Sequence, residues 1–138
     1  MTEKSITQEL RKTEKIIKEI ELDNQQIVKI FDLSRKISAD AYLVSMAVKM
    51  EVAVDESLFS DAELAVTPFD EIVKTVGSHV VFEYKDERNF IMAENKDAVL
   101  NELVDKFLEN MIGYLSKESF PAKLVFKKYR DMKKRLPF

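Results

Sequence analysis

The chain has 138 residues, of which 46% are hydrophobic and 34% charged, and its net charge is -3. This composition is typical of one folded domain spanning residues 1–138, and the lack of cysteine excludes disulfides, thiolate metal sites and a cysteine nucleophile. Charge is unevenly distributed, because residues 121–138 hold seven cations and one anion, a net +6, which leaves -9 for residues 1–120. Two glycines and three prolines favour a mainly α fold over a sandwich of many short strands.

A heptad pattern predicts one long N-terminal helix over residues 2–35, because apolar side chains recur in alternating steps of four and three. Asn24 would then occupy a core position of a coiled-coil seam and set its register. An alternative breaks the helix at Asp23, which would act as an N-cap with Gln26 as its capping-box partner. Neither glycine nor proline is present there to force a stop, so one helix is favoured. The residues proposed to form an oligomer interface along this seam are Leu10, Ile17, Ile20, Asn24, Ile27 and Phe31.

The segment 37–52 is apolar around most of a helical turn, which predicts a second helix buried in a helical bundle. Its second half also alternates like a strand, so residues 48–54 fit either a helix or a strand.

Two local signals predict short helices in the middle of the chain. Ser60 and Glu63 have the spacing of a capping box for one helical turn. A helix over 68–76 is expected between Thr67, as N-cap before a proline, and Gly77, as its stop.

A β-hairpin is predicted over 79–93, with strands at 79–84 and 89–93 on either side of the charged segment 85–88. Helices over 96–116 and 121–135 complete the predicted fold, a mainly α helical bundle with this one β-hairpin.

The sequence indicates a protein that is not an enzyme. The single histidine, His79, follows no nucleophile motif, and Gly77 and Gly113 are too far apart to form a phosphate loop. An enzyme would need a metal held by carboxylates such as Glu102 and Asp105, but these lie on the polar face of a predicted helix. We therefore expect no catalytic, cofactor-binding or metal-binding residues and no cofactor.

Two surfaces remain as candidates for function. The heptad seam predicts a non-catalytic oligomerising or adaptor module, whose partner is a second copy or another helical protein. The alternative is a small helical subunit that contacts nucleic acid, or an acidic partner, through the basic helix 123–135. The absence of a signal peptide or a membrane span predicts a cytoplasmic location. The residues proposed for the basic surface are Lys123, Lys127, Lys128, Tyr129, Arg130, Lys133, Lys134 and Arg135.

Overall fold

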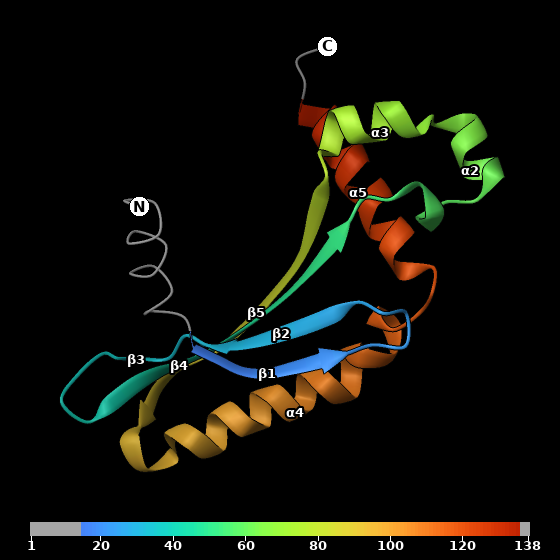
Figure 1. The fold of residues 1–138 in the computed structure, drawn as a ribbon. Helices are drawn as coiled ribbons and strands as arrows, with labels where there is room; N and C mark the ends of the chain where they lie inside the picture. The colour runs from blue at the N-terminus through green and yellow to red at the C-terminus, as the bar shows by residue number, and fades with distance from the viewer. Residues whose placement is uncertain (1–14, 136–138) are drawn as a thin grey trace, which may run out of the picture.

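The computed structural model describes residues 15–135 and shows a five-stranded antiparallel sheet with a long helix packed against one face (Figure 1). The predicted mainly α bundle with one hairpin is therefore wrong, and the fold is α+β. In chain order the elements are β1 (Lys15–Glu21), β2 (Ile27–Asp32), β3 (Arg35–Lys36), β4 (Ala41–Ala53), η1 (Glu56–Leu58), α2 (Asp61–Val66), α3 (Phe69–Val76), β5 (His79–Met92), η2 (Ala93–Asn95), α4 (Lys96–Leu115) and α5 (Phe120–Arg135).

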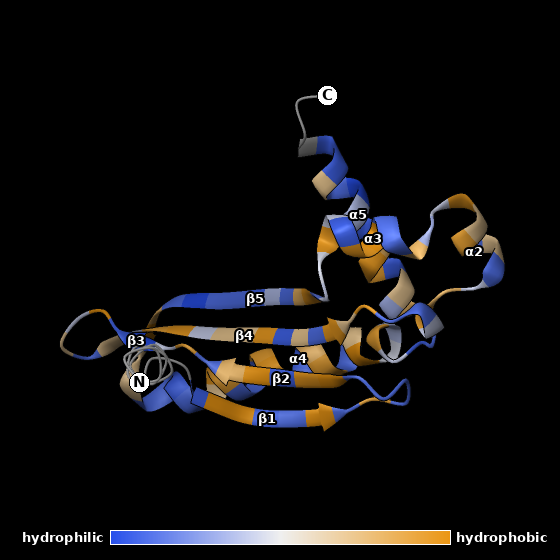
Figure 2. Ribbon diagram, turned by 45° about the horizontal axis from the view of Figure 1, so that its top comes forward, coloured by the Kyte–Doolittle hydropathy of each residue, from blue (hydrophilic) through white to orange (hydrophobic). Residues whose placement is uncertain are grey.

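The sheet is built around β4, the central strand. β2 and β3 pair with one side of β4, β5 pairs with its other side, and β1 pairs with the far side of β2. Figure 2 shows β1, β2, β4 and β5 side by side in that order, with α4 behind them. Within the described chain, β1, β5 and the two-residue β3 each pair on one side only and are therefore the edges of the sheet.

The helix predicted over 2–35 is wrong in its described part, where β1 and β2 form an antiparallel pair. Both strands are rich in isoleucine and valine, whose branched side chains fit a pleated surface. The turn between them needs no glycine or proline, because Gln25 adopts a φ of 70° and the side chain of Asn24 accepts a hydrogen bond from the Gln26 N–H (3.1 Å). Residues 2–14 of that predicted helix lie outside the described residues.

The buried helix predicted over 37–52 is also wrong, because this segment forms the long strand β4. The alternative of a strand at 48–54 was the correct one for residues up to Ala53. All five residues from Val44 to Val48 are buried, so both faces of the strand are apolar or small there. A strand buried on both faces lacks the usual alternation, which is why its sequence resembles a buried helix.

The predicted hairpin over 79–93 is a single strand, β5, which pairs with β4 instead of folding back on itself. The charged segment expected to turn stays extended, with Lys85 opposite Ala47 and Arg88 opposite Val44. The irregularity falls later, at Phe90, which has a φ of 54° beside a register shift. The charged residues did not mark a turn, because they lie on an edge strand, where polar side chains reach solvent.

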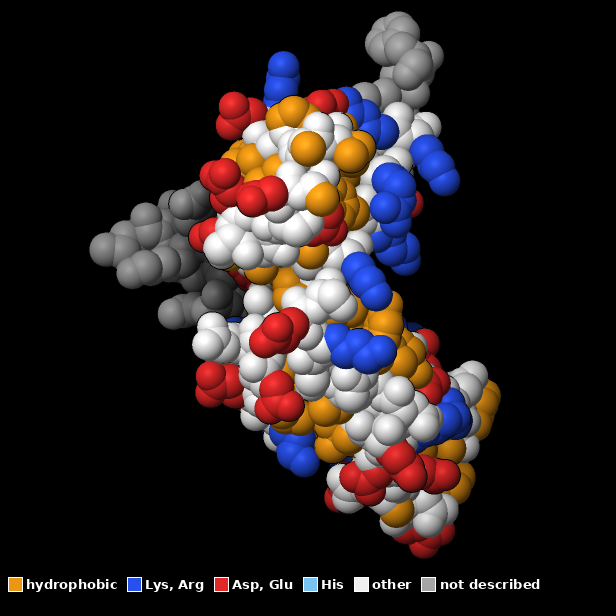
Figure 3. All heavy atoms as spheres, turned by 90° about the vertical axis from the view of Figure 1, so that its right-hand side faces the viewer, with side chains coloured by type: hydrophobic (Ala, Val, Ile, Leu, Met, Phe, Trp, Pro, Cys, Tyr) orange, Lys and Arg blue, Asp and Glu red, His pale blue; other side chains and the backbone are white. Residues whose placement is uncertain are grey.

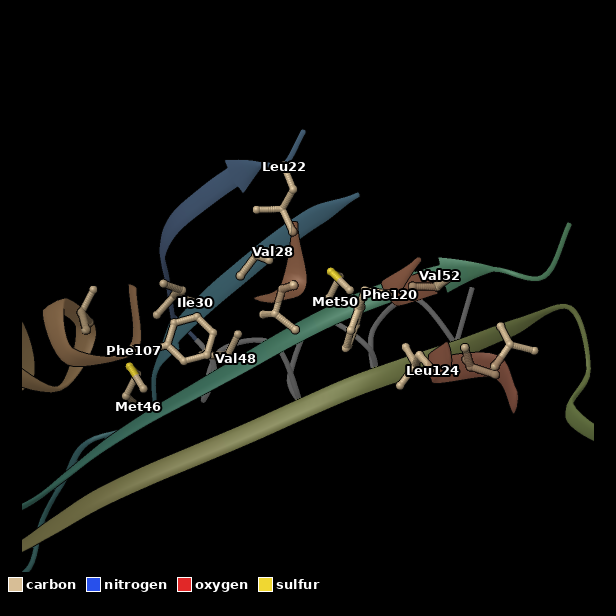
Figure 4. Close-up of a cluster of buried hydrophobic side chains, with 14 of the residues drawn as sticks. Leu22, Val28, Ile30, Met46, Val48, Met50, Val52, Phe107, Phe120 and Leu124 are labelled. Atoms are coloured by element: carbon tan, nitrogen blue, oxygen red, sulfur yellow. The ribbon is translucent and has the colours of Figure 1, made fainter. Parts of the chain in front are cut away.

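The hydrophobic core lies between the sheet and α4. Figure 4 shows Phe107 of α4 lying among side chains from β2 and β4, near Ile30, Met46 and Val48. Its ring also packs against Tyr84 of β5, with 5.3 Å between ring centroids. Burying a side chain of this size stabilises the fold by about 1.5–3 kcal/mol, so the contact fixes which face of the sheet the helix covers. The buried residues of α4 are Leu100, Leu103, Val104, Phe107 and Leu115.

A second group of apolar side chains holds α3 and α5 together at the far end of the β4–β5 ribbon (Figure 1). Phe59 packs against Phe69 of α3 and Phe126 of α5, at centroid distances of 6.3 and 5.1 Å. Ile72 and Val125 are fully buried beside them. The two ends of α5 therefore contact different parts of the molecule, because Phe120 at its start joins the core under the sheet.

Local signals located the helices near their observed positions. The capping box of Ser60 and Glu63 is confirmed at the start of α2. The helix expected over 68–76 corresponds to α3, and Gly77 follows it with a φ of 86°. Thr67 is not its N-cap, because that residue instead ends α2 and donates its N–H to Glu63. The helices predicted over 96–116 and 121–135 correspond to α4 and α5.

Candidate interaction surfaces

The candidate functional features of residues 15–135 are surfaces. Among residues 15–135, no three histidine, aspartate or glutamate side chains are grouped closely enough to hold a metal ion. His79 is exposed and contacts Ser78 (2.9 Å between Nδ1 and Oγ) and Glu51 (3.6 Å between Nε2 and Oε1). No helix in this range is both long and apolar enough to cross a bilayer.

The face of the sheet opposite α4, here called the outer face, carries charges in an ordered row. The strand register places four charged residues side by side across the sheet. In order from β1 through β2 and β4 to β5, they are Glu19, Lys29, Lys49 and Glu83. Two central cations are thus flanked by an anion on each side. Opposite charges on neighbouring strands stabilise a sheet by roughly 0.2–1 kcal/mol per pair and like charges destabilise it, so the central Lys29–Lys49 pair offsets part of what the two flanking pairs contribute.

Next to this row the outer face is apolar. Phe31 is buried, and the Lys49 ammonium group lies 5.5 Å from the centroid of its ring. Ile27 remains 47% exposed on the same strand. A hollow of about 440 Å³ lies over this part of β2, β4 and β5, and both Ile27 and Phe31 line it.

The edge strand β1 exposes large apolar side chains where the sheet ends. Ile16 is 51% exposed and Ile17 is 37% exposed. Ile17 is the extra residue of a β-bulge, because the register with β2 shifts between Ile16 and Lys18. An edge strand has unpaired backbone donors and acceptors, and exposed isoleucines beside them make β1 a candidate site for the addition of a further strand.

The structure separates the residues of the predicted heptad seam. Ile17 and Ile20 lie on β1, but Ile20 packs toward the core. Ile27 and Phe31 lie on the outer face through β2, and Leu10 lies outside the described residues. No helical seam joins them within residues 15–135, so the coiled-coil interpretation is wrong.

Asn24, predicted as a polar core position of the coiled coil, anchors the β1–β2 turn to the end of α4. Its amide Nδ2 donates to the carbonyl oxygens of Leu115 (2.8 Å) and Lys117 (2.9 Å). These carbonyls belong to the helix terminus and the residues beyond it, where backbone acceptors lack helical partners. Sequence separation hid this role, because the contact joins residues more than 90 positions apart.

Four basic residues of α5 share one exposed side of the helix. Lys123, Lys127, Arg130 and Lys134 are spaced by four, three and four residues and are all exposed, and we call them the cation stripe. Steps of this size keep the four within about 60° of arc on a helix. Figure 3 shows Lys and Arg side chains in a band below the C-terminal end of the described chain.

Tyr129 and Lys133 face α3 and both contact Glu71. The Tyr129 hydroxyl donates to Oε1 of Glu71 (2.7 Å), and the Lys133 ammonium lies 3.3 Å from the same oxygen. The hydrogen bond from Tyr129 is the main reason why the pKa of Glu71 is lowered, with Lys133 adding to the effect. The same bond raises the pKa of Tyr129.

Lys128 is half-buried on α5, and the side chain of Arg135 lies outside the described residues. Of the eight residues proposed for the basic surface, the structure therefore brings four together on one exposed face.

The edge strand β1 was missed because a helix was expected there. The signal was three β-branched isoleucines within the seven residues Lys15–Glu21.

Comparison of the chain with family models, with curated proteins and with solved structures finds no significant match.

Proposed function

We propose that the protein is a non-catalytic adaptor that binds an extended segment of another protein along β1. The observation that carries this proposal is the edge strand itself: it pairs on one side only within the described chain, and it exposes Ile16 and Ile17. Addition of a strand satisfies the free backbone groups, while alternate side-chain positions provide specificity.

The charges of β1 favour a foreign strand over a second copy. By register with β2, Lys18 points to the face covered by α4, whereas Glu19 points to the outer face. Two antiparallel copies related by a two-fold axis place one residue opposite itself, and at the middle of β1 this is Lys18 or Glu19. Each of these two central registers opposes like charges, which disfavours the pairing of two copies in them.

The preferred partner strand follows from the same register. It should place apolar side chains beside Ile16 and Ile17, and a lysine or arginine beside Glu19 and Glu21, on the outer face. It should place an acidic side chain beside Lys18 on the other face. Among residues 15–135 none of the charged side chains of β1 forms a salt bridge.

The other long edge strand, β5, is a weaker candidate, because the charges of its segment 85–88 are neutralised within the strand. Lys85 pairs with Glu87 (3.4 Å) and Arg88 pairs with Asp86 (2.9 Å). The bulge at Phe90 also interrupts its register with β4. Both features protect an edge against the addition of a strand.

Site-specific photo-crosslinking in the producing cell tests the proposal. A crosslinking amino acid replaces Ile17 on the edge or, as the matched control, the exposed Lys106 on α4. We expect an adduct with one identified protein from position 17 only, and the purified partner should bind the Ile16→Lys chain at least about tenfold more weakly. Equal adducts from both positions, adducts only with a second copy, or unchanged binding of the Ile16→Lys chain would refute the proposal.

A further inference from the structure

A second surface, the cation stripe of α5, differs from β1 because it contains no apolar side chain. Most apolar residues of α5 are packed into the protein: Leu124 and Val125 are buried, and Phe126 packs against Phe59, whereas Met132 is 41% exposed. The cation stripe lies on the opposite side of the helix from Val125. Apart from Met132, α5 therefore presents to solvent a line of positive charge without an apolar face broad enough to enter a bilayer.

The four cations are available for a ligand. Within residues 15–135, no carboxylate forms a salt bridge with Lys123, Lys127, Arg130 or Lys134. Lys133, by contrast, is not part of the stripe and pairs with Glu71. The acidic body of the protein thus leaves the stripe uncompensated.

The spacing of the stripe suits an evenly charged polymer. At 1.5 Å per residue, neighbouring members are separated along the helix by about 4.5–6 Å, and the whole stripe is about 16 Å long. Cations in a line can each neutralise one phosphate of an extended backbone and release its counterion.

We propose that the cation stripe binds the sugar–phosphate backbone of single-stranded nucleic acid without reading its bases. Tyr129, the aromatic residue on this part of α5, does not serve as a stacking platform. Its hydroxyl is held by Glu71, and the Lys133 ammonium group lies 5.5 Å from the centroid of its ring. Binding should therefore depend strongly on salt and little on base sequence.

Fluorescence anisotropy with the full chain and labelled 20-nucleotide single strands tests this inference. With about four phosphates neutralised, the logarithm of the association constant should fall against the logarithm of the salt concentration with a slope of about -3. Oligo(dT) and a mixed-sequence strand should bind within about threefold of each other. Absence of binding at low salt, or a slope near zero, would overturn the inference.

Variants locate the site. Lys127→Glu with Arg130→Glu should weaken binding at least about tenfold, whereas the control of equal charge change, Lys36→Glu with Lys106→Glu, should stay within about threefold. Tyr129→Leu, checked for folding by circular dichroism, should also bind within about threefold, because stacking on an aromatic ring would be worth more than that. Equal losses in both double variants contradict the assignment, and so does a large loss in Tyr129→Leu.

Anionic vesicles separate this ligand from a membrane. Vesicles containing phosphatidylserine should compete for the labelled strand poorly, because most of the apolar side chains of α5 are buried. The proposal would be overturned if the protein bound vesicles more tightly than the strand and if Lys127→Glu with Arg130→Glu abolished that binding. The ligand of the cation stripe would then be a membrane surface and not nucleic acid.

Discussion

Replacing Asn24 by alanine distinguishes the turn that the structure shows from the coiled coil that the heptad pattern predicts. In a helix this change is favourable, because alanine has the higher helix propensity. In the observed turn it removes three hydrogen bonds, two donated to the carbonyls of Leu115 and Lys117 and one accepted from the Gln26 N–H. The two interpretations therefore predict opposite signs for the change in stability.

The structure sets the size of the expected loss. Two of the three bonds are part-buried and one is exposed. At about 1 kcal/mol for each part-buried bond, and less for the exposed one, Asn24→Ala should lower the free energy of unfolding by about 2 kcal/mol. For a chain of this length the melting temperature should then fall by roughly 5–10 °C.

Urea unfolding followed by circular dichroism measures this loss, with Asn101→Ala on the exposed side of α4 as the matched control. The control should be neutral or slightly stabilising. Asn24→Asp keeps the acceptor for the Gln26 N–H but turns a carboxylate toward two carbonyl oxygens, so at neutral pH it should be no more stable than Asn24→Ala. An Asn24→Ala protein at least as stable as the parent would refute the role assigned to this turn.

Further predictions concern the two glycines and the contact between α3 and α5. Gly77→Ala should destabilise the protein by about 1–2 kcal/mol, because the φ of Gly77 is 86°. Gly113 lies in α4 with open space around it, so Gly113→Ala should stabilise the protein by about 0.5 kcal/mol. Urea unfolding checks both changes, and a similar effect at the two sites would contradict the backbone argument. Because the pKa of Glu71 is lower in the folded protein, its contribution to stability is complete above the unfolded pKa and is lost as the pH falls through the folded pKa. Tyr129→Phe should return the pKa of Glu71 toward its ordinary value in an NMR titration, and an unchanged titration would show that Lys133 alone holds this carboxylate.

The candidate surfaces were only partly predictable. The basic helix is visible in the sequence, because charge composition is independent of fold. The sequence did not show which of these cations are available to a ligand. Glu71 engages Tyr129 and Lys133, but it lies 58 positions from Tyr129. The edge strand was concealed by the heptad pattern.

The sequence by itself determined the helices in the second half of the chain and the capping of α2. Capping boxes, proline starts, glycine stops and a 3.6-residue apolar period all act within a few neighbouring positions, so they are readable without a partner. These signals correctly anticipated α3, α4 and α5 to within one or two residues at each end.

Only the tertiary structure decided that the first half of the chain is a sheet. The isoleucine-rich segments leading to β1 and β2, and the apolar segment of β4, satisfy a helical period as well as a strand period. Their state depends on pairing partners: β4 is extended because β5, far along the chain, lies beside it from Ala41 to Ala53. Strand hydrogen bonds are made between segments and not within one, so the sequence of a single segment could not decide between them.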